Sequence, residues 1–257
     1  MTVAVYLRRL FAVLAVLGLA ILGSVAAASA APTLRFKTKA LPIPGFPGTG
    51  NFLGAGAVIQ IEGKVSGTEY GGFPPPLIGI KAYVPAGAKV HPQGFANCTP
   101  AAIEKNGPTA CPKSSLAGPK GFAVGEVSFG GERVQERASV QPFFAPGANL
   151  GFYVEGRSPV ALEILAKAGQ FVSAAPPFGL EFIGEVPLIE TVPGALDASF
   201  YEGIISVGAA YKHGKKTISY ITLPKHCPRG GLPLKAELSF YGGATAEASY
   251  KMPCPKR

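Results

Sequence analysis

The amino-acid sequence predicts an all-β fold, a single sandwich-like domain of short antiparallel strands joined by long loops rich in proline and glycine. Residues 57–66 alternate apolar and polar side chains with the period of two that marks a half-buried strand. Turn signals then recur about every 8–12 residues, a spacing typical of sandwiches and barrels. No long amphipathic helix is indicated in residues 31–257. Together these three observations favour the all-β class, and the chain is long enough for one such domain.

The first thirty residues have the pattern of a secretory signal peptide. Arg8 and Arg9 precede a long apolar run, and an Ala-Ser-Ala exit follows at residues 28–30. We expect residues 1–30 to form an apolar signal helix that is removed, so that the rest of the chain is secreted or held at the cell envelope. The alternative is an uncleaved membrane anchor at residues 10–28, because roughly 20 apolar residues can span a bilayer.

The segment that follows, residues 31–50, is rich in proline and glycine and carries Arg35, Lys37 and Lys39. It predicts an extended lead-in that stays outside the packed domain of residues 51–257.

Strand patterns then follow one another to the end of the chain. Residues 85–121 predict a long loop, and only residues 100–105 and 160–167 fit short helices, the second in competition with a strand. The predicted strands lie at 57–66, 77–84, 122–129, 134–140, 150–154, 160–164, 180–186, 199–207, 217–223, 232–241 and 244–252.

Composition excludes some functions and leaves others open. Loss of Arg8 and Arg9 with the signal segment lowers the formal net charge from +9 to +7. Such an excess is typical of a soluble basic surface, and it also fits attraction to an anionic polymer or headgroup. Asp197 is the only aspartate, so the clustered oxygen ligands of a calcium loop are missing. Tryptophan is absent, which leaves tyrosine and phenylalanine as aromatic platforms for a sugar.

The four cysteines, Cys98, Cys111, Cys227 and Cys254, predict two disulfides in an exported chain, with three possible pairings. Sequence distance favours Cys98 with Cys111 and Cys227 with Cys254. A structural zinc site is disfavoured because such sites use cysteine pairs only a few residues apart. We expect no metal and no cofactor.

A proline follows Cys111, Cys227 and Cys254, and the first two Cys-Pro turns each lead into a predicted strand. We expect these turns to orient a disulfide at a strand entrance; the functional alternative is a set of basic loops on one rim. Together with the signal peptide, the Cys-Pro turns resemble those of an uncharacterised family of secreted bacterial β-rich proteins. The resemblance implies an extracellular β-rich domain and brings no catalytic residues and no assigned function.

The patterns of common enzyme chemistry are missing from the sequence. No G-x-S-x-G nucleophile elbow occurs, and His91, His213 and His226 are far apart in sequence and fit surface turns. The remaining route is a carboxylate pair, as in glycoside hydrolysis. Outward positions on strands explain the central glutamates without a site, so a secreted hydrolase with a Glu-based site is kept as an alternative. These glutamates are Glu155, Glu163, Glu181, Glu185, Glu190 and Glu202.

One group of residues points to binding. Lys212, Lys215 and Lys216 form a compact cationic segment that fits a hairpin tip, and Lys256 and Arg257 add charge at the terminus. Such tips attract anionic polymers, and they also keep strand ends from pairing with other chains. We therefore predict an exported non-enzymatic protein that binds an anionic envelope polymer or a surface protein. No nucleic-acid partner is expected, and a membrane is a partner only if the signal segment stays uncleaved.

Overall fold

The computed structural model describes residues 31–255, apart from the side chain of Lys167, and these residues form one compact unit. The predicted signal segment 1–30 and the terminal Lys256 and Arg257 lie outside the described residues. The predicted β-rich fold is confirmed. Among residues 31–255, no helix combines the length and the apolar character needed to cross a membrane.

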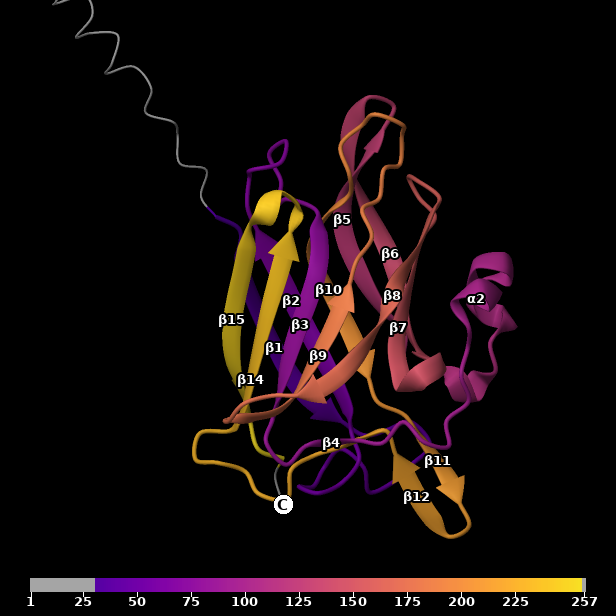
Figure 1. Cartoon of the computed structure of the whole chain (residues 1–257), viewed down its shortest axis with the longest axis vertical. Coiled ribbons are helices and arrows are strands. Elements are labelled where there is room, and N and C mark those ends of the chain that lie inside the picture. Colours follow the sequence, from indigo (N-terminus) through magenta and orange to yellow (C-terminus); the bar gives the residue numbers. More distant parts are fainter. Residues whose placement is uncertain (1–30, 256–257) are drawn as a thin grey trace, which may run out of the picture. The chain divides into compact units, whose positions relative to one another are not determined.

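Most of the chain forms one antiparallel sheet of eleven strands in the order β1-β2-β10-β5-β6-β7-β8-β9-β3-β14-β15 (Figure 1). The strands are β1 (Thr33–Leu41), β2 (Val58–Ser66), β3 (Leu77–Pro85), β5 (Gly121–Phe129), β6 (Glu132–Ala145), β7 (Asn149–Gly156), β8 (Leu162–Ser173), β9 (Phe178–Glu185), β10 (Ser199–Val207), β14 (Leu232–Phe240) and β15 (Thr245–Met252).

Short elements complete the fold. Strand β4 pairs with β13 and strand β11 with β12, each as a separate two-stranded sheet. The only α-helix of residues 31–255 is α2, and four single 3-10 turns, η1 to η4, lie in the loops. Their bounds are β4 (Lys89–Val90), α2 (Pro100–Asn106), η1 (Pro108–Ala110), η2 (Lys113–Ser115), η3 (Pro146–Ala148), β11 (Ala210–His213), β12 (Lys216–Ser219), β13 (Ile221–Thr222) and η4 (Tyr241–Gly243).

The large sheet curls until it nearly closes into a barrel. Its two outermost strands, β1 and β15, come side by side, and the rings of Phe36 and Tyr250 meet across the seam. The predicted two-sheet sandwich is not confirmed, because the ladder runs from β1 to β15 without a break. Continuous strand twist, which sequence periodicity does not report, is what allows a long sheet to curl in this way.

The prediction of an unpacked lead-in is wrong for residues 33–41. They form β1, which pairs with β2 along its whole length, from Thr33 opposite Ser66 to Leu41 opposite Val58. Arg35, Lys37 and Lys39 occupy the exposed face of this strand, and the residues between them turn toward the core. Exposed lysines on an edge strand are a known protection against pairing with other chains.

Of the two short helices that the sequence predicts, one is confirmed and one is wrong. The short helix at residues 100–105 is confirmed as α2, whereas the helical interpretation of residues 160–167 is wrong, because residues 162–173 form β8. The hairpin predicted at 232–241 and 244–252 is confirmed as β14 and β15.

An aromatic cluster fills the half of the barrel from which β11 and β12 project. Phe144 lies 4.6 Å from Tyr220 and 4.5 Å from Phe95 between ring centroids, and Phe171 lies 5.3 Å from Phe182. Tyr220 is fully buried although it belongs to the link between β12 and β13. Its N–H donates to the carbonyl oxygen of Ala209 and its carbonyl oxygen accepts from the N–H of His91, both at 2.8 Å. The loops at this end are therefore fastened to the core.

Candidate functional site

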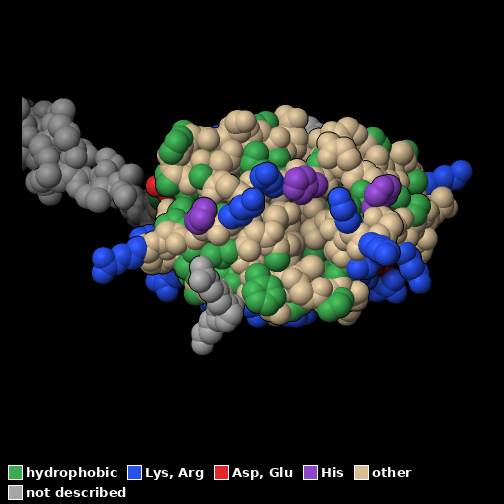
Figure 2. All heavy atoms as spheres, turned by 90° about the horizontal axis from the view of Figure 1, so that it is seen from below, with side chains coloured by type: hydrophobic (Ala, Val, Ile, Leu, Met, Phe, Trp, Pro, Cys, Tyr) green, Lys and Arg blue, Asp and Glu red, His purple; other side chains and the backbone are tan. Residues whose placement is uncertain are grey.

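One end of the sheet carries the excess positive charge of the domain. We call it the basic end; it consists of residues 42–57, 86–97, 112–120 and 208–231, which surround the lower mouth of the sheet in Figure 1. None of these described residues is Asp or Glu. Figure 2, which looks onto this face, shows lysine, arginine and histidine side chains across it and very little acidic surface. The basic residues are Lys89, Lys113, Lys120, Lys212, Lys215, Lys216, Lys225 and Arg229, and the histidines are His91, His213 and His226.

The remainder of residues 31–257 is close to neutral. It holds fourteen basic and fifteen acidic residues, against eight basic and no acidic residues at the basic end. On the strands, cations and carboxylates pair, as in Lys37 with Glu62 at 3.3 Å and Lys64 with Glu202 at 3.7 Å. No cation of the basic end takes part in an ion pair within the described residues. Its positive potential is therefore unscreened by neighbouring carboxylates.

Backbone hydrogen bonds join the segments of the basic end into one surface. The N–H of Gly54 donates to the carbonyl oxygen of Pro224 at 2.9 Å, and that of Gly208 donates to Ala117 at 2.7 Å. Strand β4 pairs with β13 through Val90 opposite Ile221. Chain segments that are 91 to 170 residues apart thus present their side chains together.

The predicted lysine cluster lies on the hairpin of β11 and β12, whose tip is Gly214. Lys212, Lys215 and Lys216 are all exposed there. The Lys212 ammonium donates to the Thr217 hydroxyl at 2.8 Å and lies 5.8 Å from the centre of the Phe46 ring. The structure brings these three lysines together, while Lys256 and Arg257 lie outside the described residues.

Two open clefts lie at the basic end, one on each side of Tyr211. The larger measures about 500 Å³ and is lined by residues 47–49, 54–56 and 217–219 together with His91, Gln93 and Thr222. The smaller measures about 350 Å³, and Phe46, Phe95 and Lys113 lie in its wall. Tyr211 lines both, so that its ring stands between the two cavities.

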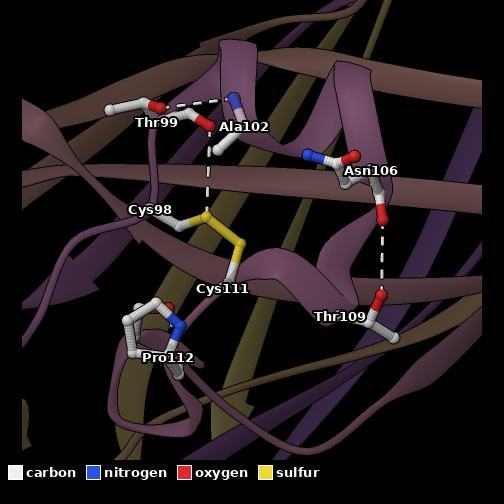
Figure 3. The surroundings of a disulfide bond; sticks show 8 residues. Cys98, Thr99, Ala102, Asn106, Thr109, Cys111 and Pro112 are labelled. Atoms are coloured by element: carbon white, nitrogen blue, oxygen red, sulfur yellow. Dashed lines mark hydrogen bonds between the residues drawn. A yellow bond between two sulfur atoms is a disulfide. The ribbon is translucent and has the colours of Figure 1, made fainter.

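The first disulfide positions the lysine of the smaller cleft. Cys98 and Cys111 are bonded and enclose helix α2, whose first turn is capped by the Thr99 hydroxyl accepting from the N–H of Ala102 at 3.2 Å (Figure 3). The Cys111-Pro112 turn leads directly into η2, which begins at Lys113. The predicted pairing of these cysteines is confirmed.

The second disulfide acts in the same way on the next basic loop. Cys227 is bonded to Cys254, as predicted, and the loop held before β14 carries Lys225, His226 and Arg229. The Cys227-Pro228 turn lies in the loop that leads into β14, whereas the Cys111-Pro112 turn leads into η2, and β5 begins only at Gly121. The expectation of a strand entrance therefore fails for the first turn, and a basic residue follows each turn directly. The functional alternative, a set of basic loops on one rim, stays a prediction.

Sequence reasoning missed the gathering of the three histidines and of Lys89, which are far apart along the chain. One signal could have indicated it. Between Glu202 and Glu237 the sequence has six basic residues and no acidic one. A long stretch of single-sign charge in an otherwise balanced chain points to a charged face.

The glutamates of the hydrolase alternative are scattered over the sheet. Glu155 and Glu163 lie opposite each other on β7 and β8, but Glu155 accepts from Arg157 at 2.7 Å, away from both clefts. Burial of Tyr153 and, to a smaller extent, the negative charge of Glu163 raise the pKa of the tyrosine to about 12. No carboxylate lines either cleft. The remaining glutamates lie on β9 (Glu181, Glu185), in the loop after it (Glu190) and on β10 (Glu202).

Groups that could hold a metal ion do not assemble either. Within residues 31–255, no three His, Cys, Asp or Glu side chains come together as a metal site requires. The basic end therefore offers cations, other hydrogen-bonding side chains and aromatic rings.

Comparison of the chain with known proteins finds no matching family model, no matching curated protein and no matching solved structure. The arrangement of residues at the basic end is thus the basis for assigning a function.

Proposed function

We propose that this chain is an exported, non-enzymatic protein that binds an anionic polymer of the cell envelope through its basic end. The observation that carries the proposal is the separation of charge, with eight cations and no carboxylate at one end of a sheet that is otherwise neutral. A surface of one sign raises the local concentration of a polyanion, and binding releases the counterions of the polymer.

Export is supported by two features. The N-terminal segment has the basic, apolar and small-residue parts of a signal peptide. The two disulfides fit an oxidising compartment outside the cytoplasm. The mass of the protein recovered from the producing cells tests the point, because cleavage after Ala30 removes thirty residues. An intact mass with membrane association would replace the secreted form by the signal-anchored alternative.

The first experiment is co-sedimentation of oxidised residues 31–257 with the envelope fraction, followed by binding to linear polyphosphate across a salt titration. Binding by counterion release weakens about tenfold or more between roughly 50 and 200 mM salt. The test variant replaces Lys212, Lys215 and Lys216 by glutamine. We expect at least a tenfold loss of affinity for both the envelope and the polyphosphate.

The matched control replaces Arg35, Lys37 and Lys39 by glutamine, which removes the same charge from the exposed face of β1. It is expected to keep most of the affinity. Equal losses in the two variants would show that net charge alone governs binding. Absence of binding at every salt concentration would reject the proposed function.

A further inference from the structure

The clefts on either side of Tyr211 offer hydrogen-bonding and aromatic groups, which electrostatic attraction of a polyanion would not require. Their volumes, about 500 and 350 Å³, fall in the range of small-molecule sites, roughly 300–1,000 Å³. Both lie inside the basic end, where a bound polyanion would cover them. What lines each cleft therefore bears on the chemical class of the polymer, given the proposed function.

The larger cleft offers hydrogen-bonding side chains other than lysine and arginine. His91, Gln93, Thr217 and Ser219 all line it. The side chains of His91, Gln93 and Ser219 form no hydrogen bond with another residue of the described chain. No lysine or arginine lines this cleft; the Lys212 ammonium reaches only its edge, through the Thr217 hydroxyl. This lining suits a polymer unit that is rich in hydroxyl groups. The negative charge of that unit would face outward, toward the rim of the cleft.

The smaller cleft offers aromatic rings beside a cation. The rings of Phe95 and Tyr211 lie 4.9 Å apart and nearly perpendicular, and Phe95 also packs on the core ring of Phe144. Phe46 and the exposed Lys113 also line this cleft. Aromatic faces pack against the apolar C–H faces of a sugar ring, while a neighbouring ammonium attracts its carboxylate or other anionic group.

Tyr211 fixes the boundary between the clefts. Its hydroxyl donates to the carbonyl oxygen of Gln93 at 3.2 Å. Residue 94 is a glycine with φ of 84°, and a Cβ at that position would collide with the same hydroxyl. The tyrosine hydroxyl thus sits in a contact that only glycine permits at position 94.

From this arrangement we propose that the two clefts are adjoining subsites for consecutive units of an acidic polysaccharide. One unit lies against Phe46, Phe95 and Tyr211, and the next exchanges hydrogen bonds with His91, Gln93 and Ser219. Single-stranded nucleic acid also stacks on aromatic rings. It is disfavoured here because neither cleft contains arginine, the residue best suited to paired contacts with phosphate.

The test compares three soluble probes at one ionic strength with oxidised residues 31–257: oligogalacturonate, linear polyphosphate and oligo-dT of similar charge. The variants are F46A, S219A and, as the charge control, the triple glutamine variant of Lys212, Lys215 and Lys216. Circular dichroism and thermal unfolding check that each variant is folded. F46L serves in place of F46A if the loop is disturbed.

We expect oligogalacturonate to bind at least tenfold more tightly than polyphosphate. F46A and S219A should each weaken oligogalacturonate binding about three- to tenfold and leave polyphosphate binding unchanged, whereas the lysine variant weakens both. If polyphosphate binds as tightly as oligogalacturonate and F46A affects neither, the polysaccharide inference is overturned and the proposed function stands. Preference for oligo-dT would replace the polysaccharide by nucleic acid, and no binding of any probe would reject the proposed function itself.

Discussion

The rings of Phe36 and Tyr250 lie 6.0 Å apart between centroids, at an angle of 55°, and connect the first strand of the sheet to the last. Both side chains pack against a buried cluster that includes Ile59 and Leu234. Because β1 and β15 are not joined by a ladder, side-chain packing of this kind holds the seam together.

The seam predicts that F36A lowers the free energy of unfolding by about 2 kcal/mol, less than the ~3–5 kcal/mol of a fully buried phenylalanine because Phe36 is half-buried. Urea denaturation measures the change. The control is F129A, which removes a ring that is 51% exposed at the turn between β5 and β6. Equal effects of the two substitutions would show that the seam contact does not stabilise the fold.

The two disulfides are expected to stabilise the fold by different amounts, because the chain loops that they close differ in length. Replacing Cys227 and Cys254 by serine is expected to cost about 3.6 kcal/mol, and replacing Cys98 and Cys111 about 3 kcal/mol, since the longer loop restricts the unfolded chain more. Urea denaturation of each double variant beside the oxidised parent protein gives both values. A loss below about 1 kcal/mol for either pair would contradict this account.

The cluster of Lys235 with Glu237 and Glu247 predicts sensitivity to acid. The Lys235 ammonium lies 2.7 Å from Glu237 and 2.9 Å from Glu247, and its hydrogen bond is the main cause that lowers the pKa of Glu237. A lowered carboxyl pKa adds stability above the ordinary carboxyl pKa, and that stability is lost as the pH falls through the lowered value. E237Q should remove this part of the acid dependence, at most about 1 kcal/mol because both side chains of the pair keep contact with solvent. Unfolding curves between pH 7 and pH 2, about the range in which carboxyls titrate, would refute the assignment if both proteins lost stability in parallel.

Glu126 predicts a pH dependence of stability opposite to that of Glu237. Burial raises the pKa of this carboxyl, and the nearby Arg133 offsets only part of the shift. The native state therefore holds the proton more strongly than the unfolded chain, so its contribution is largest in acid and is lost as the pH rises through the raised pKa. We expect E126Q to be more stable than the parent protein at neutral pH and to differ least from it in acid. The exposed Glu132 provides the control, E132Q, which should leave the pH profile unchanged.

Patterns within short sequence segments predicted the elements whose structure depends on residues that are close together in the sequence. The alternation in residues 57–66 is β2, the Gly242-Gly243 turn separates β14 from β15, and the nearest cysteines in sequence form the disulfides. The period of two and the chemistry of turns are properties of short segments, so one sequence is enough to reveal them.

Long-range pairing could not be predicted in this way. Strand β10 lies between β2 and β5, far from both in sequence, and the meeting of β1 and β15 depends on the twist of the whole sheet. The basic end illustrates the same limit for the site. The sequence placed Lys212 on a hairpin, but only folding brings His91, Lys113 and Arg229 to the same surface. Tyr211 gave no signal, because its role comes from a contact with residues 93 and 94.

The charge arrangement also makes the domain an electric dipole, positive at the hairpin of β11 and β12 and close to neutral elsewhere. A dipole turns in the field of an anionic surface before any atom touches it, so encounters begin with the positive pole leading. The turns at the opposite end, where Phe129 and Tyr241 are half-exposed, then face the medium. A layer of these molecules on a polyanion would therefore share one orientation and cover the polyanion with a less charged, partly aromatic outer surface.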